Sequence, residues 1–142
     1  MTASPRSLAL VRTKAVGFLE AIKNGTAERL KQEARYRVYA EIVFAYWQVK
    51  LNHPISILDT KREKRIVSRL RESRGDWGLL CFAIDGALRD DYLMGRDDRA
   101  QRKYDGIETV FRDRAQVERL AELCPRFQAG QQHSLCIKYG AP

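Results

Sequence analysis

The stretch YRVYAEIVFAYWQVKL, residues 36–51, decides the fold of this chain. Its apolar side chains repeat at helical spacing and occupy nearly the whole circumference of the helix that they predict. A helix that is apolar on almost every side has to be surrounded by other elements. We therefore expect a central, buried helix that starts after a cap at Thr26. It should end before His53-Pro54, because a residue that precedes proline is driven out of the helical region.

Further helices are predicted on both sides of this one. Upstream, Ser4-Pro5 can start a helix that ends at Asn24-Gly25. Downstream, three segments of helical periodicity each follow an acidic cap: Asp59 (helix over about 60–73), Asp76 and Asp113. A polar loop over 90–105 and a short helix over 106–111 separate the last two. The only strand candidate is SLCIKY, residues 134–139. The sequence thus predicts an all-α fold, a small single-domain bundle of about five to six helices.

The totals are those of an ordinary globular protein. The chain has 142 residues, of which 44% are hydrophobic and 31% are charged, enough to bury a core. We divide it into an N-terminal helical extension (1–40), a helical domain (41–124) and a flexible tail (125–142). No apolar run approaches the ~20 residues of a membrane helix and no signal peptide is evident, so we expect no membrane association. The three separated cysteines predict free thiols in a reducing cytosol.

Positive charge is concentrated in the first half of the chain. The net charge is +8; residues 1–74 carry 16 Lys and Arg against 7 Asp and Glu, whereas residues 75–142 carry 10 against 11. This asymmetry favours a face for a polyanion, usually nucleic acid. The alternative is a basic surface that is only solvated.

The segment TKREKRIVSRLRESRG, residues 60–75, is the strongest candidate for such a face. It holds seven Lys and Arg and two Glu. Cations on three sides of one helix cannot all be paired locally, so a phosphate backbone is a natural counter-charge. Phosphate contacts carry no sequence information, so we expect single- or double-stranded DNA to be bound with weak sequence specificity at most. The candidate residues are Lys61, Arg62, Lys64, Arg65, Arg69, Arg71 and Arg74.

A second contact is predicted at Arg102, Lys103 and Tyr104. The tyrosine ring can stack on an unpaired base. The alternative is that Tyr104 packs into the core at the start of a helix. Both alternatives remain open at this point.

The residues needed for catalysis or metal binding are not found in a recognisable pattern. The two histidines do not adjoin a cysteine or serine in a known nucleophile motif, and the cysteines and histidines are too scattered for a zinc site. The pairs Asp90-Asp91 and Asp97-Asp98 lack the spacing of a calcium loop, and we expect them to be solvated or paired with neighbouring arginines. There is no glycine-rich phosphate loop. We therefore expect no enzymatic activity, no cofactor and no metal.

The order of the motifs suggests a family. An aromatic helix comes first (Phe44, Tyr46, Trp47), followed by a basic helix (Lys61, Arg62, Ile66, Arg69, Leu70) and an AIDG helix (83–86). A Met-Gly-x-Asp segment comes next (Met94, Gly95, Asp97). The last element is led by a tyrosine (Tyr104, Ile107, Glu108, Val110, Phe111, Arg112). In this pattern residues 43–123 resemble the conserved C-terminal module of bacteriophage replication proteins, of the replisome-organiser and helicase-loader type with DnaD-like character. The first 40 residues are too short for the winged helix that precedes this module in the family.

The resemblance implies a non-enzymatic DNA-binding or helicase-recruiting accessory protein of phage or mobile-element DNA replication. It implies DNA and the host replicative helicase as partners, and the cytoplasm of a bacterial host cell as the location. The first predicted helix has enough apolar residues for a dimer seam, so a homo-oligomer is also considered. The alternative function is that of a small phage- or island-encoded interaction protein that binds and inhibits a host or defence protein. In that case the basic helix would grip an acidic protein surface.

Overall fold

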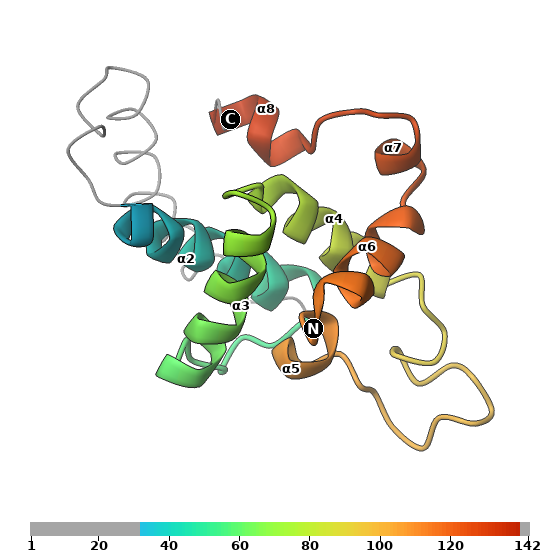
Figure 1. The fold of residues 1–142 in the computed structure, drawn as a ribbon. Helices are drawn as coiled ribbons and strands as arrows, with labels where there is room; N and C mark the ends of the chain where they lie inside the picture. The colour runs from blue at the N-terminus through green and yellow to red at the C-terminus, as the bar shows by residue number, and fades with distance from the viewer. Residues whose placement is uncertain (1–31, 140–142) are drawn as a thin grey trace.

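All regular secondary structure in the described part of the chain is helical, which confirms the all-α prediction. The computed structural model describes residues 32–139. Its elements in order are α2 (Gln32–Lys50), α3 (Thr60–Glu72), α4 (Trp77–Ala87), α5 (Ile107–Val110), α6 (Arg114–Glu122), α7 (Pro125–Gln128) and α8 (Ser134–Tyr139) (Figure 1). The helix predicted from Ser4-Pro5 and the cap predicted at Thr26 lie outside the described residues.

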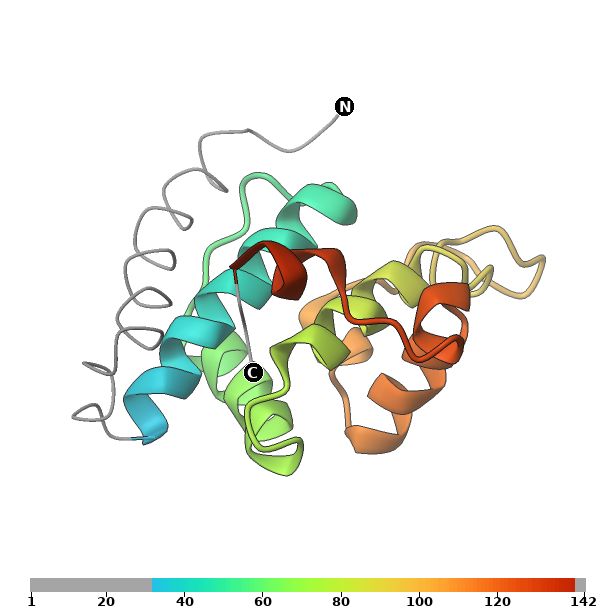
Figure 2. The same cartoon turned by 90° about the horizontal axis from the view of Figure 1, so that it is seen from above.

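Helix α2 is the central element, as its sequence predicts. Its side chains are buried from Tyr36 to Gln48 on almost every side, and Trp47 is only 2% exposed. Helices α3 and α4 both pack against it (Figure 2). The indole of Trp47 donates a hydrogen bond of 2.9 Å to the carbonyl oxygen of Asp105, and the ring of His53 stacks on it at 4.3 Å. These contacts hold the turn after α2 and the end of the long loop against the same helix.

The three predicted caps are confirmed. The side chain of Asp59 accepts from the backbone N–H of Arg62 at 2.8 Å at the start of α3. In the same way Asp76 caps α4 and Asp113 caps α6, at 3.1 and 2.7 Å. Each carboxylate satisfies an N–H group that has no partner within the first turn of its helix.

Helices α4 and α6 form the most extensive helix pair (Figure 2). Gly86 lies at their contact, where a Cβ atom would overlap the backbone carbonyl of Leu120. The two backbones can approach this closely because Gly86 has no side chain. The glycine of the AIDG motif is therefore explained by packing.

The predicted domain limit at residue 40 does not separate two elements. The limit at residue 40 falls inside α2, whose residues Tyr36, Tyr39 and Ala40 are buried in the core. After Pro125, where a flexible tail was expected, the described part up to Tyr139 contains α7 and α8. The SLCIKY segment is thus a helix and not a strand. Cys136 is buried on one side of this helix, and Ile137 and Lys138 are exposed.

The tail is held to the core by two buried residues, Cys136 and His133. Together with Cys81 and Cys124, Cys136 is a free thiol, as the cysteine spacing predicts. None of the helices between residues 32 and 139 is long and apolar enough to cross a bilayer.

Candidate nucleic-acid interface

Helix α3 has one apolar and one basic face. Ile66, Val67 and Leu70 are buried against the core. On the other side, a shallow groove of about 280 Å³ is lined by Lys61, Lys64, Arg65, Ser68 and Arg69. Relative to Lys61, these residues stand at positions i, i+3, i+4, i+7 and i+8, which places them on one side of a helix. We call them the α3 groove.

Three of the seven candidate cations of this segment have acidic partners. Arg62 lies 3.6 Å from Asp59, and Arg69 pairs with Glu72 at 3.0 Å. Arg71 forms a two-pronged ion pair with Glu33, with N–O distances of 2.9 and 2.8 Å. The charges of these three arginines are thus partly compensated within the protein.

The other four are available to a partner molecule. Lys61, Lys64 and Arg74 have no ion-pair partner within residues 32–139, and all three are exposed. Among the described residues, Arg65 is bound only to a backbone carbonyl, that of Arg112, at 3.2 Å. Four of the seven candidate cations therefore have no ion-pair partner among the described residues, which agrees with the expectation that not all of them are paired locally.

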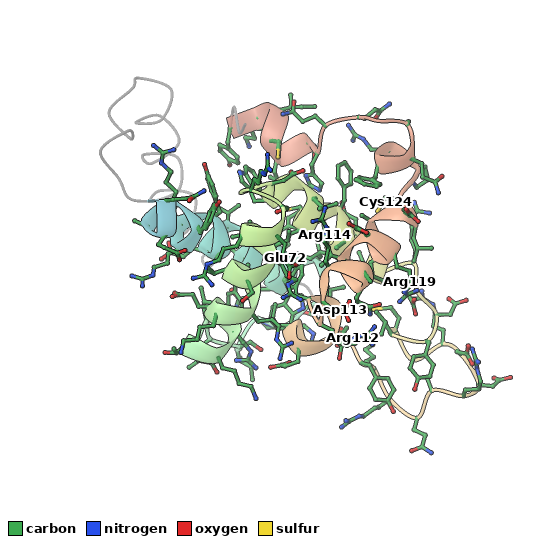
Figure 3. All side chains as sticks on the ribbon, in the orientation of Figure 1. Glu72, Arg112, Asp113, Arg114, Arg119 and Cys124 are labelled. Atoms are coloured by element: carbon green, nitrogen blue, oxygen red, sulfur yellow. The ribbon has the colours of Figure 1, made fainter. Side chains whose placement is uncertain are left out.

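Two arginines missing from the predicted site lie beside the α3 groove. Arg69 donates to the carbonyl oxygen of Arg112 at 3.0 Å, as Arg65 does, and Arg114 donates to the carbonyl oxygen of Glu72 at 3.3 Å. Figure 3 shows Arg114 at the start of α6, close to Glu72, and Arg112 just before that start. Both side chains are more than half exposed and each has one acidic neighbour. The charges of Arg112 and Arg114 are visible in the sequence. No sequence signal indicates, however, that this segment contacts a helix 43 residues earlier.

Acidic groups at this face remain ionised at neutral pH. The pKa of Asp113 is lowered because its carboxylate accepts the N–H of Gln116, and also because Arg112 and Arg69 lie near it. The hydrogen bond from Arg71 likewise lowers the pKa of Glu33. These carboxylates offset part of the positive charge but do not reach Lys61 or Lys64.

The second predicted contact is not adjacent to the first. Arg102, Lys103 and Tyr104 lie near the end of the loop between α4 and α5; Figures 1 and 2 show that the tip of this loop projects away from α3. The ring of Tyr104 is stacked on that of Tyr92, with centroids 5.3 Å apart, and packs partly against the core. The guanidinium of Arg102 lies 5.2 Å from the Tyr104 ring. Tyr104 is therefore already engaged in packing, whereas Arg102 and Lys103 are exposed.

Two aspartates of the same loop, Asp91 and Asp97, pair with arginines of the loop, as the sequence predicts. Arg96 pairs with Asp91 at 2.9 Å and Arg99 with Asp97 at 2.8 Å. No group of three or more His, Cys, Asp or Glu between residues 32 and 139 is placed to hold a metal ion.

Comparisons of the chain with protein-family models, with curated proteins and with solved structures found no match. The chemistry of the candidate interface therefore has to be judged from its own residues. Cations along one helix face, of which Lys61 and Lys64 are exposed, are suited to binding anionic oxygens.

Proposed function

We propose that this chain is a non-enzymatic accessory protein of phage or mobile-element DNA replication that binds DNA through the α3 groove. The observation that carries the proposal is the pair Lys61 and Lys64. Both are exposed, have no ion-pair partner in the described part of the chain and lie beside Arg65 on one helix face. Cations in this state can release the counterions of a phosphate backbone without first breaking an internal ion pair.

The size of the groove suits a short run of phosphates. From Lys61 to Arg69 a helix rises about 12 Å, the length of three to four nucleotide steps of a duplex strand. Arg112 and Arg114 extend the positive surface beyond the end of α3. Phosphate contacts carry no sequence information, so binding through these cations is expected to depend on the DNA backbone and little on sequence.

The role in replication rests on the resemblance of residues 43–123 to phage replication modules. Several residues of that pattern have packing roles in this chain: Trp47 is buried, and Gly86 allows α4 to approach α6. The basic helix contributes the exposed Lys61 to this pattern, next to Lys64. It is thus the element through which DNA binding or helicase recruitment would occur.

The salt dependence of DNA binding tests the proposal. Fluorescence anisotropy with labelled single- and double-stranded 20-mers would be measured from about 50 to about 200 mM salt. About six phosphate contacts would lower the affinity for duplex DNA by a factor on the order of a thousand over this range. Absence of binding at the lowest salt, or a change of less than about tenfold, would contradict the proposal.

A protein partner is the second candidate, and a specific observation favours it. Ile55 and Ile57, in the loop that leads into α3, are 93% and 70% exposed. Arg62 donates to the carbonyl oxygen of Ile57 at 2.9 Å, so this apolar pair is held next to the α3 groove. An acidic protein surface with an apolar patch, on a helicase or on a defence protein, would fit both features.

The two candidates can be separated with two variants. In the protein-partner case, Ile55→Ser with Ile57→Ser would weaken capture of a purified replicative helicase and leave DNA affinity unchanged. In the DNA case, Lys61→Gln with Lys64→Gln would weaken DNA binding. If the lysine variant keeps full DNA affinity but loses a protein complex, the protein partner is the correct candidate.

A further inference from the structure

A second basic site lies away from the α3 groove, in a pocket of about 480 Å³. The end of α2, the second half of α4 and the segment that runs from Cys124 through α7 to Ser134 enclose it. Figures 1 and 2 show this last segment passing over α4 and returning towards α2. Three cations on different elements line the pocket: Lys50, Arg89 and Arg126.

The one carboxylate in the pocket wall, that of Asp85, is already occupied. The hydroxyl of Tyr46 donates to one of its oxygens at 2.6 Å, and Nε2 of His133 lies 2.9 Å from the other. The backbone N–H of Leu135 donates to Nδ1 of His133, which leaves Nε2 as the nitrogen that carries a proton. Both carboxylate oxygens thus have a donor, and neither requires an arginine of the pocket.

The three cations are not neutralised by other acids within residues 32–139. Lys50 lies 5.5 Å from the ring of Tyr46, and Arg126 donates to the amide oxygen of Gln131 at 3.1 Å. The acid next to Arg89 in sequence, Asp90, is bound to Arg119 instead. The ends of α2 and α4 each add a partial charge of about −0.5, which together with Asp85 still leaves the pocket at about +1.

The remaining wall is apolar apart from Ser134. Phe82, Leu88, Cys124 and Pro125 contribute to it. Burial raises the pKa of the Cys124 thiol to about 11, so it is protonated at neutral pH. Burial, and then the hydrogen bond to Asp85, raise the pKa of Tyr46 as well. A ligand in this pocket would therefore meet both cations and apolar surface.

We propose that this pocket binds a small organic phosphate, whose phosphate contacts Lys50, Arg89 and Arg126 and whose organic part lies against Phe82, Leu88 and Pro125. The site does not depend on DNA binding by the α3 groove, because the two share no residue. The volume falls in the range of small-molecule sites, and arginine forks match the geometry of phosphate oxygens.

Calorimetric titration of the full chain tests this site with three probes: dAMP, deoxyadenosine and inorganic phosphate. We expect saturable binding of one dAMP per chain. Deoxyadenosine should bind at least tenfold more weakly because it lacks the charge-assisted hydrogen bonds, and inorganic phosphate should bind more weakly because it lacks the apolar part. No saturable binding of dAMP, or equal affinity for dAMP and either of the other two probes, would overturn the proposal.

Two variants locate the binding. Arg89→Gln and Arg126→Gln, both at exposed positions, should each weaken dAMP binding about tenfold or more, while their thermal unfolding stays that of the parent chain. Lys61→Gln with Lys64→Gln should leave dAMP affinity unchanged. If the lysine variant weakens dAMP binding as much as Arg89→Gln does, the nucleotide binds to the α3 groove and the pocket assignment is wrong.

Discussion

The guanidinium of Arg69 donates a hydrogen bond of 3.0 Å to the carbonyl oxygen of Arg112, and this contact joins the basic helix to the turn that starts α6. The Arg69 side chain is only 13% exposed and also pairs with Glu72. Arg69 therefore stabilises the structure of the candidate interface, whereas Lys61 and Lys64 make no such contact within the described residues. Variants for binding studies have to respect this difference.

Replacing Arg69 should lower the stability of the fold, and not only the affinity for a ligand. Arg69→Met removes hydrogen bonds to a carbonyl and to a carboxylate, so we expect a loss of about 1 to 3 kcal/mol in the free energy of unfolding. Lys64→Met, one turn earlier on the same helix, is the matched control and should stay within about 0.5 kcal/mol of the parent. Urea unfolding measures both. Equal losses in the two variants would show that the Arg69 contact does not stabilise the fold.

Gly86 should not tolerate even a methyl group. Gly86→Ala places a Cβ atom against the Leu120 carbonyl, which cannot move away by a change of rotamer, and should cost about 3 kcal/mol or more. Gly106→Ala is the control, because its Cβ would meet only the mobile end of the Glu108 side chain; a cost within about 1 kcal/mol is expected. Thermal unfolding by circular dichroism compares the two. A Gly86 variant as stable as the Gly106 variant would contradict the close approach of α4 and α6.

Acid should destabilise the fold through its paired carboxylates. Arg99 lowers the pKa of Asp97 to about 2, and the Gln116 N–H lowers that of Asp113. Because their folded pKa values lie below the unfolded ones, these groups stabilise the fold above about pH 4, and the contribution is lost as the pH falls towards 2. The melting temperature should therefore drop between about pH 4 and pH 2, and less steeply in an Asp97→Asn, Asp113→Asn variant. An equally steep drop in that variant would refute this assignment.

Local signals in the sequence were sufficient for most of the helices. The caps Asp59, Asp76 and Asp113 and the apolar periodicity of residues 36–51 act within a few residues, and each is found as predicted. The fold of the SLCIKY segment was not predictable in this way. A stretch of six residues has no decisive period, and its helix packs through His133 and Cys136 against residues about 50 positions earlier.

The candidate interface was predictable in composition but not in detail. Seven cations in one segment are visible in the sequence, whereas their partners are tertiary: Glu33 for Arg71 and the Arg112 carbonyl for Arg65 and Arg69. For the same reason the sequence could not show that Tyr104 stacks on Tyr92. Contacts of this kind depend on chain path and not on local pattern.

Binding of a duplex 20-mer by two charge-matched variants tests the central claim most directly. Lys61→Gln with Lys64→Gln removes two free cations from the α3 groove; Arg99→Gln with Lys138→Gln removes two exposed cations from the long loop and from α8. We predict that the first variant lowers the slope of log affinity against log salt by about 1.8 and binds at least tenfold more weakly at about 50 mM salt, whereas the second keeps the parent slope. Equal slopes in the two variants would contradict DNA binding through the α3 groove.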